Sequence, residues 1–306
     1  MTAQDPNRPA ARGHAAGAIA TAMSFILWGA LPVYWKALES VDAVEIIAHR
    51  VVWSLAFTAV LVSGRRLWGQ VLRAVRSWRA AGMLALSATL LSLNWLTYVW
   101  GVNSGRILET SLGYFITPLV NVALGVIFLR ERLRPAQIAA FLLAGGGVVW
   151  EIVVRGQLPW VAAALAVTFA FYGLMRKTAA LESLPGLAAE TAMLTVPAGI
   201  FIAALFFSGG GAVGHSDWRT HLLLVGTGVV TAVPLLLFAY GARRIRMITV
   251  GVLQYLSPAG TFLLGVLKYE EKFDRQRMVT FVLVWIAVAI YVAEGIVRAR
   301  RERKVA

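Results

Sequence analysis

Ionisable residues are rare inside the apolar segments of this sequence, and three of them fall close together. Glu45, His49 and Arg50 all lie in the apolar run 43–63. On a helix, Glu45 and His49 share a face, and Arg50 lies about 100° round from His49. Arg50 could bind a carboxylate or another anionic group, and His49 could relay protons near neutral pH. The alternatives are that Glu45 lies at the outer interface and that His49 only donates a hydrogen bond between helices.

Glu190, in the apolar run 185–207, is a second acidic candidate. An acid without a partner inside a membrane would suit a proton carrier, and the alternatives are a structural ion pair or a place near the interface. When the two halves of the chain are aligned, Glu190 occupies the position that corresponds to Arg50. Their different depths argue against a direct ion pair, and the sequence leaves that question open. The candidate proton-coupling residues are therefore Glu190 and His49.

Several aromatic and amide side chains could line a binding site together with Arg50. Asn94 and Tyr98 share a helix face, and Trp28 and Tyr172 each adjoin a glycine in the middle of an apolar run. Such rings could stack on a planar substrate or simply pack in the core. The candidate substrate-binding residues are Trp28, His49, Arg50, Asn94, Tyr98, Tyr114, Tyr172 and Gln254.

Prolines inside apolar runs predict interrupted helices. Pro118 and Pro258 occupy matching positions in the two halves, after Tyr114 and Gln254 respectively, and Pro234 occupies the position that corresponds to Asn94. Interruptions at matching places in two halves of a chain are a pointer to a transporter site. The alternative is simple kinking for helix packing.

These residues belong to a stretch that the chain contains twice, in one register without gaps. The matched positions all keep the same separation: Gly101 with Gly241, Arg106 with Arg246, Pro118 with Pro258, Gly125 with Gly265, and Glu131 with Glu271. Such a match predicts duplication of a larger unit.

Composition and segment length predict an all-α integral membrane protein. The hydrophobic fraction is 59% and the charged fraction 14%, against about 45–50% and about 25% in soluble domains. Ten apolar segments approach the length of about 20 residues that crosses a bilayer. They lie at 15–35, 43–63, 80–102, 107–129, 135–154, 159–175, 185–207, 220–242, 247–267 and 278–297.

The ten expected spans divide into two units of five. Residues 15–154 form the first unit and 159–297 the second, with a polar tail at 1–14 and a basic tail at 298–306. Because five is odd, the second unit would insert upside down, which is the arrangement of inverted-repeat transporters. The predicted fold is ten transmembrane helices in two inverted five-helix repeats.

The distribution of basic residues predicts the orientation. With the N-terminus inside, 20 basic residues fall in inner segments and 8 in outer ones, so both termini are expected in the cytoplasm. The net charge of +14 is dispersed over these loops. Without a compact basic stripe, nucleic-acid binding is not expected.

Strings along nearly the whole chain resemble the EamA group of the drug/metabolite transporter superfamily, and within it the RarD branch. They include FILWGALPVYWK at 25–36, LNWLTYVWGVN at 93–103, FAFYGLMRK at 169–177 and VPLLLFAYGARRIR at 233–246. The resemblance implies a ten-helix permease of the bacterial inner membrane with a link to chloramphenicol sensitivity. It suggests export, and it leaves the substrate open.

Two classes of function remain. The first is a secondary carrier of a small organic metabolite or drug, working by alternating access, with export and proton coupling as the suggested mode. The alternative is an intramembrane lipid-handling protein or enzyme. The chain has no cysteine, and it carries no HExxH motif and no nucleotide loop, so neither catalysis nor a metal or cofactor is expected. The expected partners are a small-molecule substrate, the lipid bilayer and a second copy of the chain through the fifth and tenth spans.

Overall fold

The computed structural model describes residues 8–104, 107–156, 160–268 and 275–305, which form helices and no strand. Two of the repeat landmarks, Arg106 and Glu271, lie outside the described residues. The helices are α1 (Arg8–Ala30), α2 (Pro32–Lys36), α3 (Ala43–Gly64), α4 (Trp68–Arg76), α5 (Trp78–Asn103), α6 (Ile107–Ile127), α7 (Pro135–Arg155), α8 (Trp160–Thr178), α9 (Ser183–Ser208), α10 (Trp218–Ala242), α11 (Met247–Gln254), α12 (Leu256–Lys268) and α13 (Arg275–Val305).

Seven helical stretches among the described residues are long and apolar enough to cross a membrane. They are 13–36, 43–64, 78–101, 135–154, 183–208, 218–242 and 278–297. The other three expected segments fall on α6, on α8 and on the pair α11–α12. α1 begins at Arg8, so helix extends into the stretch expected to be a polar tail. α4, a short helix between α3 and α5, was not predicted.

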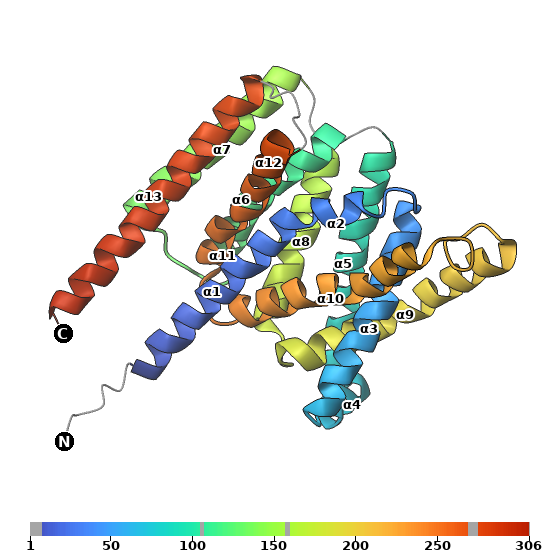
Figure 1. Cartoon of the computed structure of the whole chain (residues 1–306). Coiled ribbons are helices and arrows are strands. Elements are labelled where there is room, and N and C mark those ends of the chain that lie inside the picture. The colour runs from blue at the N-terminus through green and yellow to red at the C-terminus, as the bar shows by residue number, and fades with distance from the viewer. Residues whose placement is uncertain (1–7, 105–106, 157–159, 269–274, 306) are drawn as a thin grey trace.

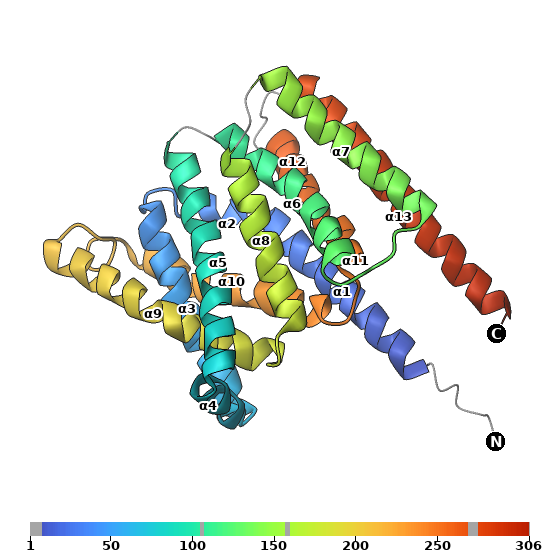
Figure 2. The ribbon, with the colours of Figure 1, turned by 180° about the vertical axis from the view of Figure 1, so that it is seen from behind.

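The helices pack in a bundle with one pair at its edge. α7 and α13 lie side by side along that edge, and the first turn of α1 and the last turn of α13 lie on the same side of the bundle (Figures 1 and 2). In the interior, α1 packs on α10 and α12, α3 on α9 and α10, and α8 on α5 and α6. α6 also packs on α11.

Glycines let α1 approach its neighbours closely. A Cβ on Gly29 would lie 2.8 Å from the carbonyl oxygen of Ser257 in α12, and a Cβ on Gly241 of α10 would lie 2.0 Å from Oγ1 of Thr21. Small residues at such contacts are typical of helix packing in membranes, where van der Waals contact drives association. These glycines hold α1 against the second half of the chain.

The prolines interrupt one of the two helices that were expected to break. The ninth expected span divides at Tyr255 into α11 and α12, and Pro258 lies in the first turn of α12, where its missing N–H is not needed. α6, in contrast, continues through Pro118, so the interruption predicted there is wrong. α10 likewise continues through Pro234.

Glu131, one of the repeat landmarks, caps the start of α11. Its carboxylate accepts hydrogen bonds from the backbone N–H groups of Met247 at 2.8 Å and Ile248 at 3.0 Å. A carboxylate is favoured there because the first N–H groups of a helix have no partner within it and carry the positive end of the helix dipole. The contact ties the end of the first half of the chain to the second half.

We expect Glu131→Ala to lower the free energy of unfolding by about 1–2 kcal/mol, the usual cost of losing a helix N-cap. Denaturant unfolding of the purified protein, followed by tryptophan fluorescence, measures the change. Glu39→Gln serves as the control, because Glu39 is exposed. Equal stability of the Glu131 variant and the control would contradict the capping role.

Candidate functional site

Arg50 of α3 is held between two tryptophan rings. Its guanidinium carbon lies 4.8 Å from the ring centre of Trp35 in α2 and 4.6 Å from that of Trp95 in α5. Its Nε donates a hydrogen bond of 3.0 Å to Oγ1 of Thr231 in α10. Cation–π contact stabilises a guanidinium that has lost part of its water. Four helices, drawn from both halves of the chain, therefore fix the position of this cation.

The fork of the Arg50 guanidinium, formed by its two Nη atoms, remains available for hydrogen bonds. Among the described residues, no hydrogen bond or ion pair involves its two Nη atoms. Tyr98 follows Trp95 by three residues on α5, so the two side chains are neighbours on that helix. The rings of Tyr98 and Tyr114 lie 6.2 Å apart, edge to face. Tyr98 is 37% exposed and Tyr114 42%. An arginine with a free fork beside accessible phenols can bind a planar carboxylate through two parallel hydrogen bonds. We call Trp35, Arg50, Trp95, Tyr98 and Tyr114 the arginine box.

His49 and Glu45 connect α3 to the loop between α9 and α10. Nδ1 of His49 accepts a hydrogen bond of 3.3 Å from Nε1 of Trp53, and Nε2 lies 3.8 Å from Oε1 of Glu45. The same Glu45 oxygen accepts a hydrogen bond of 2.7 Å from the backbone N–H of Ala212. Glu45 is buried within the protein, in the first turn of α3.

Glu190 has a partner that the sequence did not reveal. Its Oε1 lies 3.2 Å from Nη1 of Arg176 at the end of α8, and both side chains are 1% exposed. Nη2 of Arg176 donates to the carbonyl of Ser183 at 3.1 Å. Gly186 leaves room for this group, since a Cβ there would lie 2.4 Å from Nη1. Glu190 is therefore not an unpaired acid, and of the alternatives for it the structure favours an ion pair.

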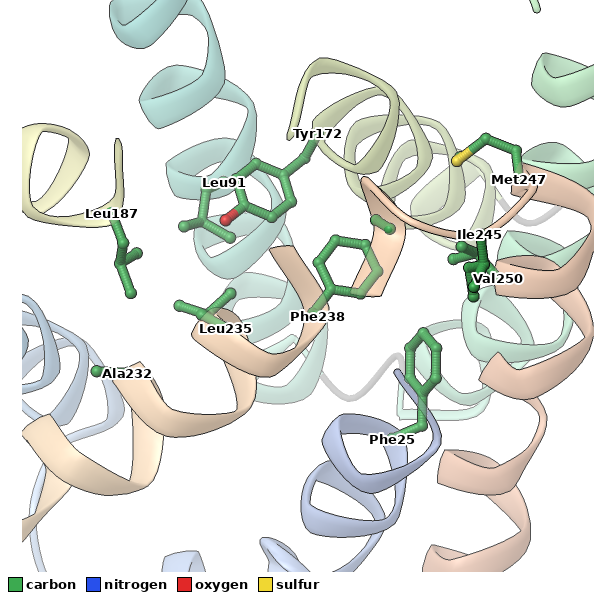
Figure 3. Close-up of a cluster of buried hydrophobic side chains, with 11 residues drawn as sticks. Phe25, Leu91, Tyr172, Leu187, Ala232, Leu235, Phe238, Ile245, Met247 and Val250 are labelled. Atoms are coloured by element: carbon green, nitrogen blue, oxygen red, sulfur yellow. The ribbon is translucent and has the colours of Figure 1, made fainter. Parts of the chain in front are cut away.

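Trp28 and Tyr172 pack in an aromatic cluster. The rings of Tyr172 and Phe238 are nearly parallel, with an interplanar angle of 14° and centroids 6.1 Å apart. Trp28 lies 5.7 Å from Phe238 and 5.6 Å from Phe169. Tyr172 and Phe238 are fully buried at the centre of this core (Figure 3). In this conformation Tyr172 is therefore closed to a substrate.

The two amide candidates join helices to one another. Nδ2 of Asn94 donates to the carbonyl of Leu165 at 2.9 Å and to Oγ1 of Thr168 at 3.0 Å, which links α5 to α8. Oε1 of Gln254 accepts a hydrogen bond of 2.5 Å from Nδ2 of Asn121, which links α11 to α6. The structure does not bring Asn94 or Gln254 into contact with Arg50.

A small open crevice lies between α6, α7, α11 and α13. Apolar side chains line most of it, among them Val122, Phe141 and Val252. It includes no member of the arginine box. Because the crevice lacks a charged side chain, the arginine box is the better candidate for recognition of a polar substrate.

The residues that sequence reasoning missed are the partners of the candidates. Trp35 and Trp95 stack on Arg50, Thr231 anchors it and Arg176 neutralises Glu190. Trp95 had one signal, since it adjoins Asn94 in a segment that was already suspected. Arg176 had none, because an arginine followed by a lysine at the end of an apolar run is typical of an inner membrane boundary.

The fold and this buried polar interior define a multi-pass membrane transporter, and comparison with known proteins supports that class. The profile of the EamA-like transporter family matches residues 15–152 and 159–293. The chain belongs to this family, and it is a multi-pass protein of the bacterial inner membrane.

Individual relatives extend the comparison. The chain is 43% identical over 288 residues to Protein RarD of Escherichia coli (strain K12), covering 94% of this chain and 97% of the relative. It is 32% identical over 280 residues to the Chloramphenicol-sensitive protein RarD of Pseudomonas aeruginosa, covering 90% and 92%. A crystal structure with a TM-score of 0.67 and 20% identity covers 90% of this chain and 96% of that one, and it supports the fold alone.

A double-mutant cycle tests the stacking of Arg50 in the arginine box. We expect Arg50→Met and Trp35→Leu to show a coupling free energy of about 0.5–2 kcal/mol in denaturant unfolding, because each change removes the same cation–π contact. The matched control pairs Arg50→Met with Trp218→Leu, a tryptophan that is 69% exposed. Additive effects in both cycles would contradict the stacking.

Proposed function

We propose that the protein is a secondary carrier that exports a small organic metabolite or drug across the inner membrane by alternating access. The observation that carries the proposal is the arginine box, in which a guanidinium with a free fork lies beside two accessible tyrosines. A carrier needs a polar site inside the membrane that a substrate can reach. Family membership supports the transport role.

The packing of the helices supports two inverted five-span repeats, with ten spans in all. Between the two repeats, α1 corresponds to α8, α3 to α9, α5 to α10 and α7 to α13. The contact of α1 with α10 then corresponds to the contact of α8 with α5. The contact of α3 with α10 corresponds in the same way to that of α9 with α5. Exchanging the repeats leaves the pairs α3–α9 and α7–α13 unchanged. Contacts that exchange in this way are those of a pseudo-two-fold axis. An odd number of spans per repeat inverts the second copy.

The proposed orientation places both termini in the cytoplasm. The excess of basic residues in the inner loops supports it, and so does the position of α1's start and α13's end on one side of the bundle (Figures 1 and 2). In this orientation the arginine box lies toward the outer side, and the ion pair of Arg176 with Glu190 lies toward the inner side.

We further propose that protons drive export and that Glu190 carries the proton. Protonation would remove the charge of Glu190 and release Arg176, which frees α8 from α9. His49, whose Nε2 has no hydrogen bond among the described residues, is a second proton-accepting position. The Pseudomonas aeruginosa relative is named for chloramphenicol sensitivity, which supports this drug and related phenicols as candidate substrates.

The outer faces of α7 and α13 are the proposed site of homodimerisation. Leu142 and Val153 of α7 are 64% and 69% exposed, and Val282 of α13 is 50% exposed. These apolar faces meet either lipid or a second copy of the chain.

We expect carboxylated solutes to stabilise the purified protein, and the effect to depend on Arg50. Thermal unfolding is measured against amino acids, aromatic metabolites and phenicols, for the wild type and for Arg50→Ala. A ligand at 100 times its dissociation constant adds about 2.7 kcal/mol to the folded state.

The stabilisation should be absent in Arg50→Ala, because the fork that binds the carboxylate is gone. Glu39→Gln is the control for a change at an exposed site. If only uncharged compounds such as phenicols act, and act equally on both proteins, Arg50 is not the binding residue. If only lipid-like compounds act, the lipid-handling alternative replaces the carrier.

Transport by Glu190→Gln should lose its pH dependence, because glutamine neither binds nor releases a proton. Uptake of the stabilising solute into proteoliposomes is measured over a pH series for the wild type and the variant. Wild-type rates across the whole series would rule out Glu190 as the proton carrier.

A further inference from the structure

The inner ion pair contains polar atoms that lack partners. The hydroxyl of Tyr172, Nε of Arg176 and Oε2 of Glu190 are all buried, and none has a hydrogen bond among the described residues. Tyr172 and Arg176 are four residues apart in α8 and so share a face of that helix. Because Arg176 pairs with Glu190, the three groups lie in one region of the interior. Native proteins rarely bury such atoms without a partner. A cluster of one guanidinium, one phenol and one carboxylate, each with an unfilled hydrogen-bonding position, can bind a further polar group.

The repeat relates this cluster to the arginine box. In the alignment of the two halves, Glu190 corresponds to Arg50 and Arg176 corresponds to Lys36. Arg50 stacks on Trp35, the neighbour of Lys36. The same junction between helices thus occurs in both halves with different charges. In the first half an arginine keeps a free fork, whereas in the second half an arginine already holds a carboxylate, that of Glu190.

An aromatic barrier separates the two arginines. Trp95 stacks on Arg50 and packs against the hydrophobic cluster that contains Tyr172, Leu187 and Phe238. Tyr172 stacks on Phe238 in the same cluster (Figure 3). Arg176 lies against Gly186, the neighbour of Leu187. A solute that passed between the halves would leave one guanidinium, cross these rings and reach the other.

We infer that Arg176 and Tyr172 form a second binding site for the carboxylate of the transported solute. Glu190 is the internal carboxylate that occupies this site while the solute is absent. The carboxylate of the solute displaces Glu190 from Arg176. The hydroxyl of Tyr172 donates a hydrogen bond to this incoming carboxylate. The inference rests on the proposed function, and it assigns to Arg176 a role in recognition in addition to its structural one.

Accessibility of a single cysteine tests the second site. The chain has no cysteine of its own, so Leu187→Cys introduces one reactive thiol into the barrier, at a residue that is 1% exposed. Labelling by a hydrophilic maleimide is followed in detergent for Leu187→Cys alone, with Glu190→Gln, and with both Glu190→Gln and Arg176→Gln. Acetate and benzoate are the probes, and acetamide and benzamide are their uncharged counterparts.

We expect Leu187→Cys alone to react slowly and the variant with Glu190→Gln to react at least about tenfold faster, which corresponds to a shift of about 1.4 kcal/mol in the opening equilibrium. Acetate and benzoate should slow the faster reaction, because they occupy Arg176, and the amides should not. With Arg176→Gln added, the carboxylates should lose their effect. Leu187→Cys with Glu45→Gln, a change at another buried carboxylate, should react like Leu187→Cys alone.

Two outcomes overturn the second site: no effect of carboxylates on the Glu190→Gln variant, or an equal effect when Arg176 is also replaced. Cooperative thermal unfolding is recorded for every variant, so that a fast reaction caused by misfolding is recognised and counts against the inference. The Arg50-dependent response to carboxylated solutes is measured on the same preparations. If that response persists while carboxylates have no Arg176-dependent effect on labelling, the second site is wrong and the proposed carrier function is retained.

Discussion

A charge inside a membrane requires a partner, because the surrounding lipid offers none. Arg176 satisfies this requirement with a carboxylate at 3.2 Å and with a backbone carbonyl. Arg50 satisfies it differently, with two aromatic faces and one hydroxyl. Removing one member of a buried ion pair typically costs about 3–5 kcal/mol, since the other charge is left uncompensated. The positions of α2, α3, α5, α8, α9 and α10 all depend on where these two cations can be accommodated.

The frame that holds the cations is fixed by contacts between the halves of the chain. Glu131 caps α11, and Gly29 and Gly241 bring α1 against α12 and α10. The glycine contacts depend on small size and add no charge to the interior, whereas the cap of α11 uses the carboxylate of Glu131.

The sequence predicted the helical membrane fold and the family, because both depend on patterns that extend along the whole chain. It also singled out Arg50 and Glu190, since ionisable residues in apolar runs are conspicuous. It did not reveal the partners of these residues, because Arg176 resembles an ordinary boundary cation and Trp35 an ordinary interfacial aromatic. Pro118 and Pro258 illustrate the same limit. Identical residues at equivalent positions have different effects, because only Pro258 falls in the first turn of a helix.

The opposite charges at positions 50 and 190 make the two halves of the chain chemically unequal. Two identical halves would carry either two arginines or two glutamates at these positions. The repeated sequence therefore preserves the places of the helices and not their charges, so a solute meets a free cation in one half and a paired acid in the other.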